Sequence, residues 1–215
     1  MAQERKNLWA ELECAFLNTF EARWQYCAEA MGLGFAQGKP MLWRREVIEK
    51  GGGIRALGAE IIEDAAGTKL VRRQSLTVNL VDNPFEQPLG KRTAADVLRR
   101  QARWARTRRK SFPLFYMPEI FAGAVLPCAA AAYAALSLGV SVPAALLCIA
   151  LAWYVPETLL GLALNWHVSW RMPLLFLLRD LMLPLIYIDA WLVDHFIWRG
   201  NEMSVDMEGA TVERG

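Results

Sequence analysis

The sequence has few of the residues that build metal sites and disulfide frameworks. Its two histidines, His167 and His195, lie apart from any cluster of cysteines and carboxylates. Its four cysteines show no metal-ligand spacing, and two of them fall in apolar runs: Cys14, Cys27, Cys128 and Cys148. This distribution is typical of free thiols in a reducing compartment, and it argues against a metal centre built on these side chains.

Charge is absent from the long stretch between Ile120 and Pro156. One helix needs about 20 apolar residues to cross the hydrocarbon layer of a bilayer, so this stretch is long enough for two. Gly139 to Pro143 provides the turn between them, and we expect membrane spans near residues 119–138 and 143–164.

A third apolar run, residues 173–193, differs because it contains Arg179, Asp180 and Asp189. Charges at that depth in a membrane are costly, and they are usually paired or functional. The run therefore predicts either a third span or a helix that lies in the interface. The sequence leaves open whether Arg179 and Asp180 only neutralise each other or take part in function.

The N-terminal sequence MAQERKNLW has no apolar core after its charges, so it does not resemble a secretory signal peptide. Many Lys and Arg residues lie between Lys91 and Lys110, just before the first expected span. By the positive-inside rule, we expect an integral protein of the inner (cytoplasmic) membrane whose soluble part is cytoplasmic. The expected parts are a soluble part (1–112), a membrane region (113–198) and a polar, disordered tail (199–215).

Local patterns in the soluble part predict both helices and strands. Apolar residues recur at helical spacing over Leu8–Ala30 and Ala56–Arg73, and residues 46–50 fit one or two helical turns. Alternating and β-branched residues predict strands over 35–45 and 76–81. Thr93, followed by Asp96, predicts a capped helix start.

Two charged clusters carry candidate chemistry. Glu60, Glu63 and Asp64 lie close together in the sequence, and Glu60 and Asp64 would share a helix face. They are either solvated carboxylates that favour a helix N-terminus, or they include a general base that removes a proton from a hydroxyl.

The second cluster is the run RRQARWARTRRK, residues 99–110. It is either a basic collar on an anionic membrane surface or a binding site for a diphosphate, which guanidinium groups bind in bidentate fashion. Arg100, Arg103 and Trp104 would share one side of a helix. Nucleic-acid binding is not expected, because the basic residues are confined to the membrane-proximal segment.

Together, and in this order, the motifs resemble a known family. They are GKPMLWRR (38–45), GG (52–53), ED (63–64), RxxRW (100–104), LRD (178–180) and IWRG (197–200). This arrangement resembles the membrane glycosyltransferases with a GT-A catalytic domain, and most of all the ceramide glucosyltransferases of glycosyltransferase family 21, in a bacterial form. The resemblance extends from about Leu8 to Ser204.

The resemblance implies a fold and a set of roles. The expected fold class is α/β: part of a GT-A, Rossmann-like domain, followed by an all-α membrane region of two or three helices. Asp64 would be the catalytic base with Glu63 as its acidic neighbour, and Arg100, Arg103 and Trp104 would bind the diphosphate and sugar of the donor. Acceptor-side positions would be Gly38, Trp43, Arg179 and Asp180. The reaction would be an inverting transfer of glucose from UDP-glucose to ceramide.

One motif of that family is missing. No two aspartates stand at D-x-D spacing, although the resemblance implies such a motif holding Mg²⁺ or Mn²⁺ on the donor diphosphate. We therefore expect the C-terminal portion of such an enzyme, with a separate N-terminal half as a possible partner. The alternatives are transfer of a hexose or N-acetylhexosamine to a hopanoid or other lipid, and a non-catalytic membrane-anchoring remnant.

Overall fold

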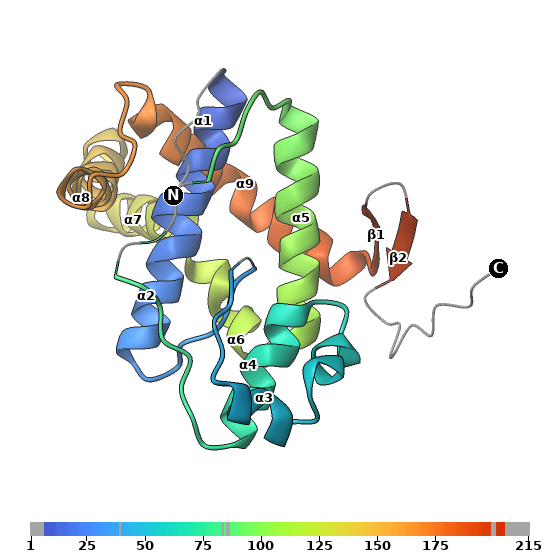
Figure 1. The fold of residues 1–215 in the computed structure, drawn as a ribbon. Helices are drawn as coiled ribbons and strands as arrows, with labels where there is room; N and C mark the ends of the chain where they lie inside the picture. The colour runs from blue at the N-terminus through green and yellow to red at the C-terminus, as the bar shows by residue number, and fades with distance from the viewer. Residues whose placement is uncertain (1–6, 39, 83, 85–86, 199–200, 205–215) are drawn as a thin grey trace.

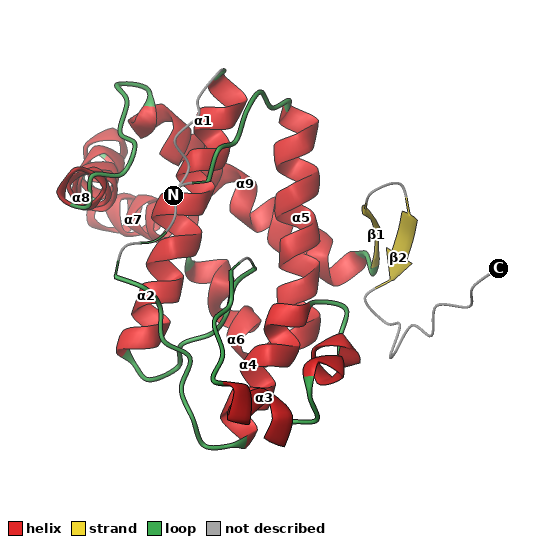
Figure 2. Ribbon diagram, viewed as in Figure 1, coloured by secondary structure: helices red, strands yellow, loops and turns green. Residues whose placement is uncertain are grey.

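The computed structural model describes residues 7–38, 40–82, 84, 87–198 and 201–204. Within these ranges the regular structure is almost all helical, as Figure 2 shows. The strands there are β1 (His195–Trp198) and β2 (Asn201–Ser204), which pair as an antiparallel hairpin. The predicted α/β, Rossmann-like half is therefore wrong. In the polar tail, residues 201–204 form a strand and are not disordered, and the rest of the tail lies outside the described residues.

Both strands predicted in the soluble part are missing for a physical reason. In segment 35–45, the amide of Ala36 bonds to a threonine hydroxyl on a helix, and Gly38 turns the chain with a φ of 71°. In segment 76–81, the Leu80 amide donates to Glu29 and the Val81 carbonyl accepts from Tyr26. Side chains thus satisfy backbone groups that a neighbouring strand would otherwise pair with.

The first helix is continuous from Leu8 to Ala30, as the apolar spacing predicts. It consists of α1 (Leu8–Ala15), the π-helical η1 (Phe16–Ala22) and α2 (Arg23–Ala30). The Asn7 side chain caps its start by accepting a hydrogen bond from the Ala10 amide at 3.0 Å. Polar residues of the π segment are buried, and such segments are frequent at functional sites.

Short helices and one long helix complete the soluble part. They are α3 (Arg45–Lys50), the 3₁₀-helix η2 (Ile54–Ala59), α4 (Glu63–Arg73) and α5 (Ala94–Ser111). The capping box of Thr93 and Asp96 is confirmed at the start of α5. The predicted helix over 56–73 is only partly right. Because α4 begins at Glu63, Glu60 does not share its face with Asp64 and instead pairs with Lys69 at 2.7 Å.

The apolar half contains α6 (Pro113–Tyr116), the 3₁₀-helix η3 (Met117–Phe121), α7 (Val125–Leu138), α8 (Val142–Ala163) and α9 (Met172–Leu192). Among the described residues, α8 is the one helix long and apolar enough to cross a membrane by itself. The pair 113–121 and 125–138 passes the same test as a span bent by 42°. Only 17% of the apolar window of α8 is buried, so its side chains face outward, unlike those of a soluble core helix.

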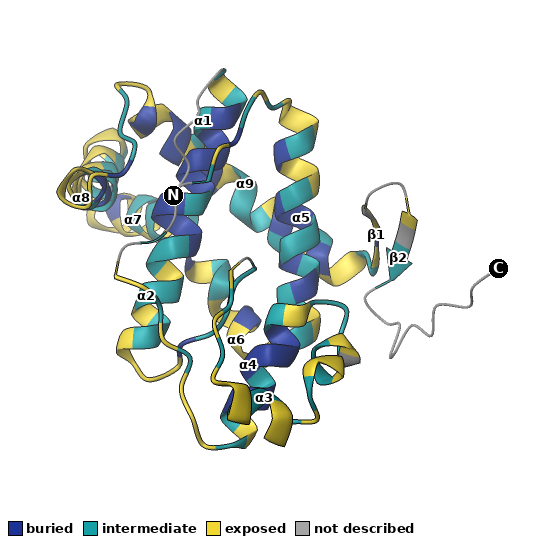
Figure 3. Ribbon diagram, in the orientation of Figure 1, coloured by how far each residue is buried: buried dark blue, intermediate teal, exposed yellow. Residues whose placement is uncertain are grey.

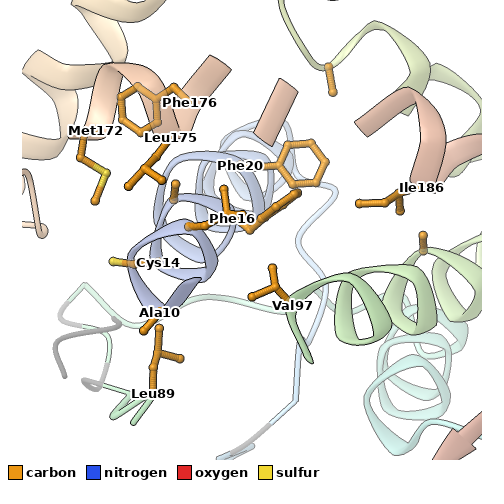
Figure 4. Packing of buried hydrophobic residues seen from close by; sticks show 14 of the residues in the cluster. Ala10, Cys14, Phe16, Phe20, Leu89, Val97, Met172, Leu175, Phe176 and Ile186 are labelled. Carbon is orange, nitrogen blue, oxygen red and sulfur yellow. The ribbon is translucent and has the colours of Figure 1, made fainter. Parts of the chain in front are cut away.

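One hydrophobic core joins residues from both sides of position 112. The continuous first helix, α5 and α9 pack around it, and Figure 4 shows Phe16 lying between Phe176 of α9 and Val97 of α5. In Figure 1, α1, α5 and α9 lie roughly in the plane of the view, whereas α8 is seen nearly along its axis. Figure 3 shows that α8 is mostly exposed, while the first helix is buried over much of its length. The α7–α8 hairpin thus projects from a helical body.

Candidate functional site

The Asp64 carboxylate lies at the N-terminal end of α4, where backbone amides hold it. The Gly38 amide donates to Oδ2 at 2.5 Å, and the Ala65 amide donates to Oδ1 at 2.7 Å. Burial raises the pKa of Asp64, the nearby Glu63 raises it further, and the two amides oppose the shift. Glu63 itself is exposed. The structure therefore brings Asp64 and Gly38 together and leaves Glu63 facing solvent.

Thr68 connects the Gly38 loop to α4. Its hydroxyl accepts a hydrogen bond from the Ala36 amide at 2.9 Å and donates one to the Asp64 carbonyl at 2.9 Å. Thr68 is fully buried, so these bonds are shielded from water. Thr68 was not among the predicted site residues, although it stands four residues after Asp64, on the same helix face.

Trp43 packs over the same turn of α4. A β-carbon added at Gly67 would lie 2.5 Å from Cη2 of the Trp43 ring, so only glycine leaves room for the indole. Three predicted positions, Gly38, Trp43 and Asp64, are thus gathered around the first turns of α4. Lys39, within the same motif, lies outside the described residues.

Ionic contacts run from this loop to α5. The side-chain amide of Gln37 donates a hydrogen bond to one carboxylate oxygen of Glu21. The other oxygen of Glu21 accepts a hydrogen bond from Arg108 at 3.0 Å. Arg108 also binds Glu119 through Nε and Nη2, both at 2.9 Å. Burial alone would lower the pKa of Arg108, but the two carboxylates outweigh it and raise that pKa. Arg108 therefore stays charged and fixes Glu21, which holds the loop beside Asp64.

Arg100 and Trp104 contact each other on α5. The Arg100 guanidinium lies 4.5 Å from the centre of the Trp104 ring, and its Nη1 lies 2.7 Å from Oε1 of Glu13. Glu13 is fully buried and also binds Arg92 at 2.9 Å. Sequence reasoning missed Glu13, although it stands four residues from both Trp9 and Leu17 on the apolar flank of its helix.

Arg103 differs from its neighbours. Within the part of the chain that the structure describes, it makes no hydrogen bond or ion pair, although it is partly buried. Burial, and then the charge of Arg100, lower its pKa. An Arg side chain stays protonated in either case, so Arg103 is a charged group whose donors are not used by any described residue. Among the same residues, no hydrogen bond, ion pair or ring contact joins it directly to the Asp64 group.

Arg179 and Asp180 are buried inside the protein with several partners. Arg179 is fully buried, binds both carboxylate oxygens of Glu157 on α8, and donates to Thr19 on η1 at 2.5 Å. Its Nε also donates to Asp180 at 2.8 Å, and Asp180 accepts from the Ala124 amide at 2.9 Å. The network ties η1, α8 and α9 together, which no sequence spacing indicates because its members are distant in the chain.

The part of the chain that the structure describes contains no ligand set for a metal ion on the donor diphosphate. Among the described residues, no three His, Cys, Asp or Glu side chains come together in a way that could hold one. The described residues therefore do not fit the Mg²⁺ or Mn²⁺ ion that the resemblance implies.

Comparison with known proteins agrees with the motifs. The family model described as Glycosyl transferase family 21 matches residues 1–211. The chain belongs to this family. Neither the curated proteins nor the solved structures gave a match. Family 21 membership covers the acidic pair on α4, the RxxRW segment on α5 and the apolar helices after them. Arg199 and Gly200, which complete the IWRG motif, lie outside the described residues.

Proposed function

We propose that this family 21 chain takes part in the inverting transfer of glucose from UDP-glucose to the primary hydroxyl of ceramide at a membrane. In such a reaction the hydroxyl oxygen forms a bond to the anomeric carbon. The bond from that carbon to the diphosphate breaks, and UDP leaves with the bonding electrons. One base and one cationic group for the leaving diphosphate are the minimum requirements.

The carboxylate of Asp64 carries this proposal. It lies in a partly buried place, its two oxygens are oriented by amides at 2.5 and 2.7 Å, and its pKa is raised by burial. A carboxylate with a raised pKa is a better proton acceptor than a fully solvated one. Asp64 would remove the hydroxyl proton, and Gly38 and Trp43 would line the acceptor side.

Arg103 is the best candidate for the donor side. No described residue uses the donors of its guanidinium, unlike Arg100, which is bound to Glu13 and stacked on Trp104. Arg103 would bind the diphosphate in bidentate fashion, while Arg100 and Trp104 present the indole toward the sugar. A separate N-terminal half would supply the rest of the nucleotide site. The soluble part would face the cytoplasm, beside the inner membrane.

The test is a transfer assay on native membranes, which carry the full chain together with its partner half. Labelled UDP-glucose and UDP-N-acetylglucosamine are each offered with ceramide and with a hopanoid, and the lipid products are separated. Glucosylceramide supports the proposal, and a hopanoid product favours the related lipid transferase instead. Asp64→Asn should reduce transfer by about 10²- to 10⁴-fold, the usual contribution of a general base.

Glu46→Gln is the matched control for that variant. Glu46 is also a carboxylate in the first turn of a helix, but it is exposed on α3. Full transfer by Asp64→Asn would show that Asp64 is not the base.

The second candidate, a non-catalytic membrane anchor, is favoured by the lack of a metal-ligand group among the described residues. It predicts no product with any donor and no binding of UDP.

A further inference from the structure

Helix α9 has two apolar faces, and only one of them is covered by protein. Its inner face contributes Met172, Leu175, Phe176, Ile186 and Ala190 to the core. The opposite face exposes large apolar side chains at helical spacing: Leu174, Leu177, Leu181, Leu185, Ile188 and Leu192. Leu181 is 53% exposed and Leu185 is 67% exposed. A stripe of this length needs a partner or a lipid environment.

Both ends of α9 are attached to the soluble part of the chain. Near its N-terminal end, Ser169 donates to Glu11 of α1 at 3.0 Å. At its C-terminal end, Asp189 binds Arg106 of α5 at 2.6 Å, and Arg106 also donates to the His195 carbonyl at 2.7 Å. Among the described residues between α1 and α5, no helix is long and apolar enough to cross a membrane. The two ends of α9 therefore lie on the same side of the bilayer.

The neighbours of α9 also indicate that this helix does not cross the membrane. It packs along α5, which carries Arg99, Arg100, Arg103, Arg106, Arg108, Arg109 and Lys110. A helix with this many cations does not enter hydrocarbon, because each buried charge is costly there. Figure 1 shows α9 running across the view beside α5, while α8 points along the view. If α8 crosses the membrane, α9 lies roughly parallel to its surface.

The contact between α8 and α9 indicates how deep in the membrane α9 lies. Glu157, which binds Arg179 of α9, stands six residues before the last residue of α8, or about 9 Å from that end at 1.5 Å per residue. The contact is therefore near one end of the candidate span and not at its middle. We infer that α9 is an interfacial helix whose exposed Leu/Ile stripe (Leu174 to Leu192) is embedded in the bilayer, so that the membrane is crossed by the α7–α8 hairpin and not by α9.

The first experiment asks on which side each loop lies. In a background of Cys14→Ala, Cys27→Ser, Cys128→Ala and Cys148→Ala, single cysteines replace the exposed Asn79, Val140 or Asn201. Sealed vesicles are treated with a membrane-impermeant maleimide. We expect positions 79 and 201 to react from one side and position 140 from the other. Labelling of 201 from the side of 140, or of all three from one side, overturns the inference.

If the altered background does not fold, protease treatment of sealed vesicles that carry the native cysteines and a C-terminal epitope tag asks the same question. The tag and the segment around Asn79 should be cleaved from the same side. Cleavage from opposite sides means that α9 crosses the membrane, which overturns the inference.

The second experiment measures depth. Spin labels at positions 174, 181 and 188 of the full chain in vesicles of neutral phospholipid are probed with oxygen and with a water-soluble nickel complex. An interfacial helix gives a similar depth at all three positions, whereas a spanning helix gives a difference of about 21 Å over fourteen residues. Labels that are immobile and closed to oxygen would show that protein, such as a second copy, covers the stripe. Either of the last two results overturns the inference.

Discussion

Replacing Thr68 by valine should separate the Gly38 loop from the base without changing side-chain volume. The Thr68 hydroxyl is the acceptor for the Ala36 amide at 2.9 Å, inside a fully buried site. Valine leaves that amide without an acceptor, which costs about 1–3 kcal/mol. The loop can regain a partner by moving toward water, and the Gly38 amide then leaves Asp64. If the loop position that transfer requires becomes less stable by about 2 kcal/mol, transfer should be roughly 30-fold slower.

The pH dependence should change as well. Asp64 acts as a base only when it is deprotonated, so transfer falls as the pH drops through its pKa, which burial already raises. The Gly38 hydrogen bond lowers that pKa, and its loss should move the acid limb of the rate profile to higher pH. Thr68→Ser keeps the hydroxyl and should restore the wild-type profile. A Thr68→Val protein with the wild-type rate and acid limb would refute the proposed link between loop and base.

Further predictions concern the cations of α5 and the buried network. Arg103→Lys should slow transfer by about 10- to 100-fold because bidentate binding of the diphosphate is lost, whereas the exposed Arg99→Lys should have no effect; equal rates for both variants would favour the basic-collar interpretation. Trp104→Phe should also slow transfer, because it removes the indole on which Arg100 stacks. Arg179→Met should lower the unfolding free energy by about 3–5 kcal/mol, since it leaves buried carboxylates without their partner. Detergent-induced unfolding measures that loss, and an unchanged midpoint would contradict the role of Arg179 in joining α8 to α9.

The local signals in the sequence were reliable where a helix depends on its own residues. Apolar spacing predicted the helix over 8–30, and the pair Thr93 and Asp96 predicted the start of α5, because caps and helix faces are short-range features. The strand predictions failed because a strand needs a neighbour. Residues 76–81 have a β-like pattern, but their backbone groups bind side chains of α2 instead.

The candidate site also has features that could be predicted from the sequence and features that could not. The acidic pair at 63–64 and the RxxRW segment are continuous motifs, so they could be found without a structure, as could the family. The partners of those motifs could not. Glu21, Thr68 and Glu13 are common residue types that become informative only when they are buried beside a charge or an amide. Burial decides their energetic weight, and burial is a property of the packed chain.

By itself, the sequence determined the family, the order of its motifs and the presence of long apolar helices, because these depend on residue identity and on spacing along one helix. Only the tertiary structure decided that Gly38 supplies an amide to Asp64, that Arg103 keeps its donors unused among the described residues while Arg100 does not, and that Arg179 faces Glu157. These pairings join positions up to 87 residues apart, and no local pattern encodes which distant charge a side chain will meet. The physical reason is that a buried charge selects its partner only when packing excludes water from both.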